Sequence, residues 1–252
     1  MIAGGTYTPS PATQNVTVSA STVAAGASDL HITPGRPATA RRDGVLVPFE
    51  GVEVLQGHDT ERMVMSLLDD RQVEELQEFR QVDFSFGLAD VGRFRANAFL
   101  QRSTHALALR VVPNRVRNLD ELGAPLACVD LLNKPYGLVL VVGPTGSGKS
   151  TTLAAMIDKI NRERKGHIIT VEDPIEFIHR HQGCIVNQRE VGTDTKTFAN
   201  ALKYALREDP DVILVGEMRD LETIQAALTI AETGHLVFAT LHTNSAAEAI
   251  NR

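Results

Sequence analysis

The fold is decided by the apolar run Leu138–Val142, the loop Gly143-Pro144-Thr145-Gly146-Ser147-Gly148-Lys149-Ser150, and the following segment Lys149–Asn161. An unbroken apolar run is typical of a strand that is buried on both faces of a parallel sheet. The segment after the loop has apolar residues at i, i+3, i+4 and i+7, namely Leu153, Met156, Ile157 and Ile160. That spacing predicts an amphipathic helix. We therefore expect strand, glycine-rich loop and helix in immediate succession.

The loop matches G-x-x-x-x-G-K-[ST], a pattern that binds nucleotide phosphates when it joins a strand to a helix. Its glycines allow backbone N–H groups to converge on phosphate oxygens, and the helix N-terminus adds partial positive charge. Lys149 is expected to reach the β- and γ-phosphates, and the Ser150 hydroxyl is expected to ligate Mg²⁺. The predicted nucleotide-binding residues are Gly143, Pro144, Thr145, Gly146, Ser147, Gly148, Lys149, Ser150 and Thr151. ATP and Mg²⁺ are the expected cofactors, since a glycine-rich turn without a ligand would leave the flanking strand and helix unexplained.

Beyond the loop, strand-like and helix-like segments alternate. The expected strands are His167–Val171, Val212–Val215 and His235–Leu241, and apolar faces predict helices around Phe198–Leu206 and Leu221–Thr233. This alternation predicts an α/β fold with a parallel, doubly wound sheet over residues 126–252.

The first half of the chain shows a different rhythm. Residues 1–27 are rich in Ser, Thr, Ala and Gly, have no secretory signal pattern and are expected to be a disordered lead-in. Residues 28–112 predict a small α+β domain, with a hairpin turn at Asp43-Gly44 and a helix from Asp59 to about Arg80. Strands are expected at Val82–Phe86, Arg93–Leu100 and Ala106–Val112. Residues 113–125 contain two prolines and are the expected linker.

Composition narrows the class of protein. The formal net charge is −6 and no long run of Lys or Arg occurs, so we expect no direct contact with nucleic acid. The two cysteines, Cys128 and Cys184, are far apart and predict neither a disulfide framework nor a zinc site. The apolar runs are too short to span a bilayer, so the expected location is the cytoplasm.

Acidic residues follow the predicted strands at the edge where an open α/β sheet binds its ligands. Glu172, Asp173 and Glu176 come after one strand, and Glu217 comes after another. An acid that ends an apolar strand often contributes to magnesium binding, which favours Glu217 as a metal-site residue. From the residues alone, either Glu217 or Glu176 could be the base that orients the attacking water. The alternative is that each is an exposed loop carboxylate.

Two histidines and three arginines are further candidates. His235 and His242 lie on either side of one predicted strand, where an imidazole can donate to a phosphate oxygen or can have only a structural role. Arg93 and Arg95 share a strand face, and Arg110 lies on the expected neighbouring strand. These guanidinium groups could act as arginine fingers across a subunit boundary, or they could form surface salt bridges.

Several segments resemble the Asp box, Walker B and His box motifs of secretion ATPases: Thr170–Glu176, Leu206–Asp211, Gly216–Asp220, Thr233–His235 and Thr240–Thr243. Within that superfamily the sequence is most similar to the twitching-motility ATPases that retract type IV pili, the PilT-like family. This closer resemblance rests on Val186–Gly192, Met218 and Gly26–His31. It covers about residues 26–252.

The resemblance implies a homo-hexameric ring whose subunits have a PAS-like N-terminal domain and a RecA-like motor domain, with ATP between them. It implies that Glu176 is the catalytic base, that Glu217 is the Walker B acid, and that His235 and His242 sense phosphate. It also implies that Arg93, Arg95 and Arg110 contact the nucleotide. Such a motor acts on the cytoplasmic face of the inner membrane through a pilus platform protein.

The sequence departs from this family in two places. The usual first helix before Gly26 is replaced by the Ser/Thr-rich lead-in, and the family's C-terminal helical domain is not present before Arg252, so the motor domain is expected to be truncated. The alternatives are a pilus-assembly or type II secretion ATPase, and a nucleotide-binding assembly module that does not hydrolyse ATP. The presence of both Glu176 and Glu217 argues against the latter.

Overall fold

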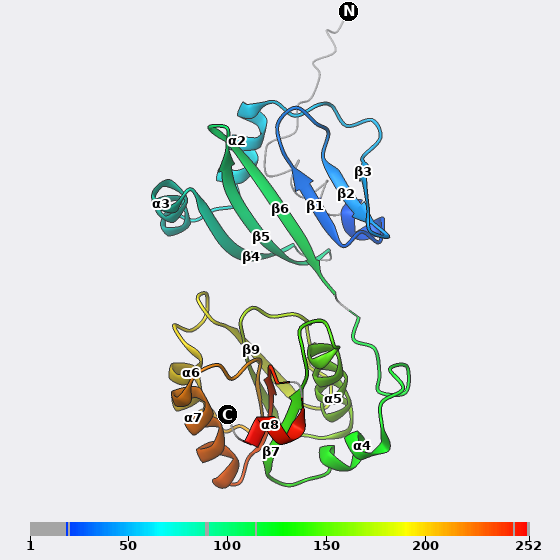
Figure 1. The fold of residues 1–252 in the computed structure, drawn as a ribbon, viewed down its shortest axis with the longest axis vertical. Coiled ribbons are helices and arrows are strands. Elements are labelled where there is room, and N and C mark those ends of the chain that lie inside the picture. The colour runs from blue at the N-terminus through cyan, green and yellow to red at the C-terminus, as the bar shows by residue number, and fades with distance from the viewer. Residues whose placement is uncertain (1–18, 20, 89–90, 114, 244, 251–252) are drawn as a thin grey trace, which may run out of the picture. The chain divides into compact units, whose positions relative to one another are not determined.

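The computed structural model describes residue 19 and residues 21–88, 91–113, 115–243 and 245–250. The chain divides into two compact units, Met1–Val112 and Pro113–Arg252, which we call the first and second units. Each unit has its own sheet (Figure 1). The first unit has one hydrophobic core and the second has two, one on each face of its sheet.

The first unit is built on a six-stranded sheet with the order β3-β2-β1-β6-β5-β4. All its strand pairs are antiparallel. The strands are β1 (Asp29–Ile32), β2 (Thr39–Arg42), β3 (Val45–Pro48), β4 (Gln81–Leu88), β5 (Gly92–Gln101) and β6 (Thr104–Val112), and the helices are α2 (Gly57–Met65) and α3 (Asp70–Phe79). The predicted hairpin is confirmed: β2 pairs with β3, and the turn residues Asp43 and Gly44 have φ values of 47° and 82°.

The single helix that we predicted from Asp59 to about Arg80 is wrong, because the structure has two helices there. Helix α2 ends at Met65, and α3 begins at Asp70. Asp69 caps α3: its carboxylate accepts from the Gln72 backbone N–H at 2.8 Å, and its own N–H donates to the Gln72 side chain at 3.0 Å. This capping box satisfies N–H groups that would otherwise bond within a continuous helix, so the chain breaks before Asp70.

The predicted lead-in and linker also differ from expectation where the structure describes them. Residues 21–24 are helical, Thr22 is fully buried and Val23 packs on the first unit's core, whereas residues 1–18 and 20 lie outside the described residues. The predicted linker 113–125 belongs to the second unit, since Leu119 is buried in that unit's core. In each segment one apolar side chain, Val23 or Leu119, packs into a hydrophobic core. The polar composition of the segments does not predict this packing.

The second unit contains a five-stranded sheet with the order β7-β11-β10-β8-β9. Every strand pair in it is parallel. Its strands are β7 (Gly137–Val142), β8 (His167–Glu172), β9 (Ile185–Glu190), β10 (Val212–Val215) and β11 (Leu236–Leu241). Its helices are α4 (Leu126–Leu132), α5 (Lys149–Glu163), α6 (Phe198–Ala205), α7 (Leu221–Glu232) and α8 (Ala246–Ile250). The predicted α/β fold with a parallel sheet is confirmed, and β9 is a strand that we did not predict.

Helices cover both faces of this sheet, with α4 and α5 on one side and α6 and α7 on the other (Figure 1). Successive residues of β10 point into opposite cores, because side chains alternate along a strand. Val212 and Leu214 pack with α5 residues such as Met156, whereas Ile213 and Val215 pack with α6 and α7. The sheet is therefore doubly wound, as predicted.

None of the helices in the described part of the chain is both long enough and apolar enough to cross a lipid bilayer.

Candidate active site

The glycine-rich loop joins β7 to α5, as the sequence predicts. Gly146 and Gly148 have φ values of 78° and 90°, a region that side chains other than glycine rarely adopt. Gly143 has a φ of 153°, and a Cβ there would lie 2.6 Å from the Ser147 Oγ atom, so a larger residue would strain the backbone and force Ser147 to move. Gly148 is also the N-cap of α5, and it has no side chain to accept from the first backbone N–H groups of the helix. These N–H groups can therefore donate to a ligand bound in the loop.

Lys149 lies over this loop. Its side chain is largely buried, and its Nζ atom donates to the carbonyl oxygens of Gly143 and Pro144, both at 3.0 Å. The same Nζ atom is 3.5 Å from Nδ1 of His242, which follows β11. The loop thus holds the ammonium group of Lys149 where the phosphates of a nucleotide would bind.

Glu217, which follows β10, is surrounded by positive and potentially positive groups. Arg219 Nη2 lies 2.7 Å from Glu217 Oε2, and His242 Nε2 lies 3.2 Å from Oε1. The hydrogen bond from Arg219 lowers the pKa of Glu217, with the charges of Arg219, His242 and Lys149 acting in the same direction. Glu217 is therefore held as a carboxylate, the form that a metal ion or a metal-bound water requires.

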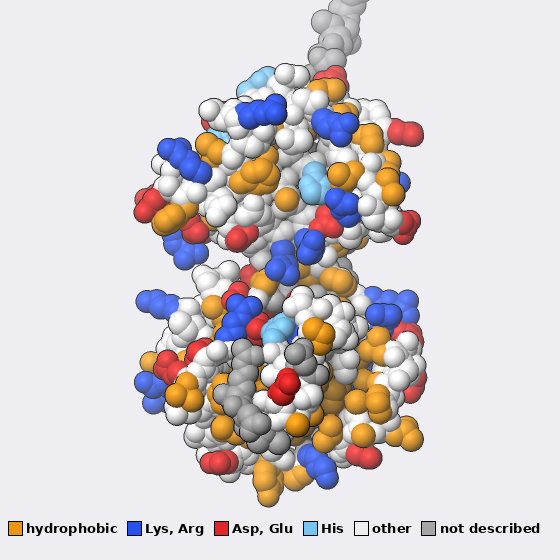
Figure 2. All heavy atoms as spheres, in the orientation of Figure 1, with side chains coloured by type: hydrophobic (Ala, Val, Ile, Leu, Met, Phe, Trp, Pro, Cys, Tyr) orange, Lys and Arg blue, Asp and Glu red, His pale blue; other side chains and the backbone are white. Residues whose placement is uncertain are grey.

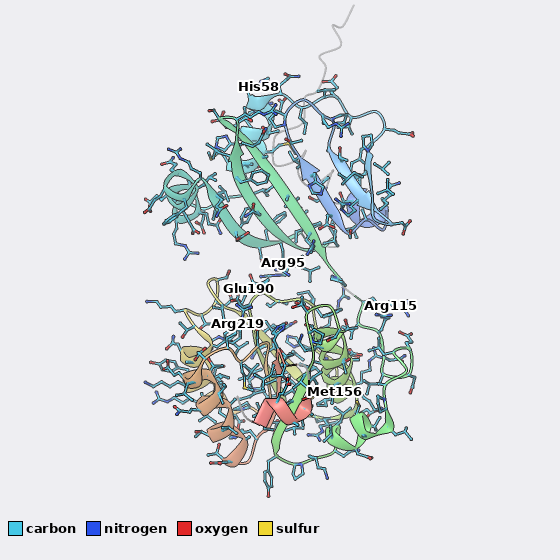
Figure 3. All side chains as sticks on the ribbon, viewed as in Figure 1. His58, Arg95, Arg115, Met156, Glu190 and Arg219 are labelled. Carbon is cyan, nitrogen blue, oxygen red and sulfur yellow. The ribbon has the colours of Figure 1, made fainter. Side chains whose placement is uncertain are left out.

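Arg219 is a functional candidate that our reading of the sequence missed (Figure 3). The signals in the sequence are its position two residues after Glu217 and its place within the motif Gly216–Asp220. In the view of Figure 2, basic, acidic and histidine side chains lie next to one another on the visible face of the second unit.

The loop after β8 carries Glu176. Glu172, at the end of β8, is buried and its Oε1 atom accepts from Thr170 Oγ1 at 2.6 Å. Burial raises the pKa of Glu172, against several hydrogen bonds that lower it. Its Oε2 atom accepts from the backbone N–H of Glu176 at 3.4 Å, whereas the Glu176 side chain is exposed.

One cavity of about 250 Å³ brings most of the predicted residues of this unit together. It is lined by Thr145, Gly146, Gly148, Lys149, Ser150, Thr151, Glu176, Gly216, Glu217, Thr240 and His242. The glycine-rich loop, both candidate acids and one candidate histidine thus share a single space at the carboxyl edge of the sheet. The residues would fit Mg-ATP: the loop is shaped by glycines, and Ser150 and an ionised Glu217 carry oxygen atoms of the kind that Mg²⁺ takes as ligands.

His235 is the exception in this unit: it does not line the cavity, and its role as a phosphate-sensing residue stays a prediction. It precedes β11, whereas His242 follows it, and the six residues of β11 separate the two by about 20 Å. His235 Nδ1 instead lies 3.2 Å from the Ile230 carbonyl oxygen and 3.3 Å from Thr233 Oγ1. It ties the end of α7 to the start of the strand, at the edge opposite the cavity.

The three candidate arginines belong to the first unit. Arg95 and Arg110 are directly opposite each other on β5 and β6, as the predicted neighbouring strands require. Arg110 Nε lies 2.8 Å from Asp29 Oδ1, so it has the salt bridge that we considered as the alternative. The roles of Arg93, Arg95 and Arg110 toward a nucleotide stay predictions.

Comparison with known proteins agrees with this geometry. The family model described as "Type II/IV secretion system protein" matches residues 14–252. The chain belongs to this family. It is 52% identical over 227 residues to the type IV pilus retraction ATPase PilT of Pseudomonas aeruginosa, covering 90% of this chain and 66% of the relative. It is 54% identical over 198 residues to the twitching motility protein of Neisseria gonorrhoeae, covering 79% of this chain and 53% of the relative.

Two solved structures are similar to this chain in fold. The crystal structure of the pilus retraction motor PilT with bound ADP has a TM-score of 0.88 and 51% identity, covering 94% of this chain and 69% of that one. The ATPase DotB of Legionella pneumophila has a TM-score of 0.82 and 30% identity, covering 99% of this chain and 70% of that one. The resemblance that we stated from the sequence is confirmed. The chain spans between about half and two thirds of the length of the two sequence relatives.

Proposed function

We propose that this chain is the ATP-hydrolysing part of a hexameric motor that retracts type IV pili. The observation that carries the proposal is the shared cavity, in which Lys149, Ser150, Glu176 and Glu217 meet. The names of the relatives supply the biological context, since PilT and the twitching motility protein are pilus proteins. The first unit would be a PAS-like domain and the second a RecA-like motor domain. The motor would act at the cytoplasmic face of the inner membrane through a platform protein.

The charged and metal-binding residues of the cavity have distinct roles in this proposal. The loop N–H groups and Lys149 would neutralise the β- and γ-phosphates, and Ser150 and Glu217 would hold Mg²⁺, which would offset charge that develops during transfer. Glu176 orients the attacking water and accepts its proton. His242, which contacts both Glu217 and Lys149, is placed to report on the γ-phosphate.

Three variants test these roles by phosphate release and by binding of a fluorescent ATP analogue. Lys149→Ala should abolish both binding and turnover. Glu176→Gln should bind the analogue normally but lower kcat by about 10²–10⁴-fold, the usual contribution of a general base. If Glu217→Gln arrests turnover with binding intact while Glu176→Gln stays active, the roles of the two acids are reversed.

The alternatives predict different results. A nucleotide-binding assembly module would bind the analogue but release no phosphate in its wild-type form. Deleting the gene of a retraction motor should leave cells with surface pili that no longer retract. Loss of the pili themselves would indicate a pilus-assembly ATPase instead.

A further inference from the structure

The loop between β8 and β9 holds Glu176 through side chains of β9. Glu190 Oε2 accepts from the Ile175 backbone N–H at 2.9 Å. Gln188 Nε2 donates to the Phe177 carbonyl oxygen at 2.8 Å, and Gln188 Oε1 accepts from the His179 backbone N–H at 2.7 Å. Glu176 therefore lies between two residues whose backbone groups are held by side chains of one strand.

The spacing of these contacts is regular. Gln188 and Glu190 are two residues apart and so share one face of β9, and the loop residues they hold, 175, 177 and 179, are also spaced by two. The amide of Gln188 both donates and accepts, as a backbone peptide group does in a sheet ladder. The two side chains thus form hydrogen bonds with alternate residues of the loop, as the backbone of a neighbouring strand would.

Glu172 links this arrangement to β8. Gln188 Nε2 also lies 3.2 Å from Glu172 Oε1, and Glu172 Oε2 accepts from the Glu176 N–H. Glu172 and Glu190 are partners in the parallel register of β8 and β9. The backbone on both sides of Glu176, and its own N–H, are consequently anchored to the ends of two paired strands. Glu190 lies within the second unit in Figure 3.

The Glu176 side chain is exposed, so its position depends on where its backbone is held. A displacement of about 1 Å in a catalytic group can cost about 10²-fold in rate. We propose that Gln188 and Glu190 are positioning residues, which set the Glu176 carboxylate against the cavity by fixing the backbone of its loop. This inference rests on the proposed function, since it takes Glu176 as the catalytic base.

Matched variants in the full-length chain separate positioning from folding. Gln188→Met keeps the side-chain length but removes both hydrogen bonds, and Glu190→Met removes the acceptor for Ile175. Glu190→Gln keeps an oxygen that can accept the same N–H. The control is Arg189→Met, since Arg189 points to the other face of β9 and pairs with Glu208 at 3.0 Å.

We expect Gln188→Met and Glu190→Met to lower kcat by about 10- to 100-fold, while the dissociation constant for the ATP analogue changes less than twofold. Glu190→Gln should recover most of the lost kcat, and Arg189→Met should resemble the wild type. Wild-type kcat in Gln188→Met, or a fall in kcat matched by an equal loss of nucleotide affinity, would overturn the proposal. If Gln188→Met does not fold, the Glu190→Met and Glu190→Gln pair decides.

A second measurement asks whether the effect acts through Glu176. Adding Gln188→Met to Glu176→Gln should cause almost no further loss of residual turnover, because the base being positioned is already gone. Full additivity of the two losses contradicts positioning. The proposed function fails separately, if the wild type releases no phosphate or if Glu176→Gln is fully active.

Discussion

At the scale of single residues, His179 shows how burial changes chemistry beside the cavity. Its side chain is 7% exposed and lines a small space of about 60 Å³ with Glu172 and Glu176. Burial lowers the pKa of His179 from 6.5 to about 4, against the opposing charge of Asp158. The imidazole is therefore neutral in the folded protein at physiological pH.

This lowered pKa predicts a loss of stability in mild acid. Below pH 6.5 the unfolded chain binds a proton at His179 that the folded chain does not accept until about pH 4. The free energy of unfolding should therefore fall by about 3 kcal/mol from this residue between pH 6.5 and 4. His179→Gln removes the titrating group, so its urea unfolding midpoint should depend less steeply on pH than that of the wild type. Equal pH dependence of the two proteins contradicts the prediction.

At the level of helices and strands, apolar spacing predicts that a helix is present but does not fix the residue at which it ends. The apolar spacing from Asp59 to Arg80 predicts one helix, yet the capping box of Asp69 and Gln72 starts a new one. Strand β9 was not predicted, because its sequence lacks the alternation of apolar and polar residues that is typical of a strand. Its inward side chains include Gln188 and Glu190, which are polar because they bind the neighbouring loop.

The Asp69 cap makes a specific prediction about helix α3. Asp69→Ala leaves the Gln72 N–H without its side-chain acceptor and should lower the free energy of unfolding of the first unit by about 1 kcal/mol. Asp69→Asn keeps an acceptor oxygen, so it should lower the free energy of unfolding by only a few tenths of a kcal/mol. Asp70→Ala is the control, since Asp70 lies in the first turn and contributes about 0.3–1 kcal/mol through the helix dipole. Urea unfolding followed by circular dichroism measures all three, and an unchanged midpoint in Asp69→Ala rules out the cap.

At the scale of the whole molecule, the two units have separate cores. The core around Leu30, Phe94 and Leu107 contains only residues of the first unit. The two cores on the faces of the parallel sheet, around Met156 and Ile213, contain only residues of the second. Each unit therefore buries its own apolar surface, which is the condition for independent folding.

We predict that residues 113–252 fold when produced alone and bind the fluorescent ATP analogue at the glycine-rich loop. The fragment should unfold cooperatively in urea, and its Lys149→Ala variant should fold equally well but fail to bind. Starting the fragment at residue 126 should destabilise it, because this removes the buried side chain of Leu119. A fragment 113–252 without cooperative unfolding would show that the second unit needs the first.

Features that depend on residues close together in the chain could be predicted from the sequence. Strand, glycine-rich loop and helix follow from apolar periodicity and from the spacing of Gly143 to Ser150, and the alternation of elements predicts a parallel sheet. The rule that parallel strands deliver their following residues to one edge placed Glu176, Glu217 and His242 near the loop. Motif resemblance then identified the family.

Contacts between residues that no sequence pattern connects became visible in the folded chain alone. The fold pairs Arg219 with Glu217, brings the His235 ring to the Ile230 carbonyl oxygen at the end of α7, and docks the Glu176 loop on Gln188 and Glu190. The strand order β7-β11-β10-β8-β9 also joins segments far apart in the chain. Such contacts depend on the packing of complete elements, and the free energy of that packing is a property of the assembled core rather than of any short stretch of sequence.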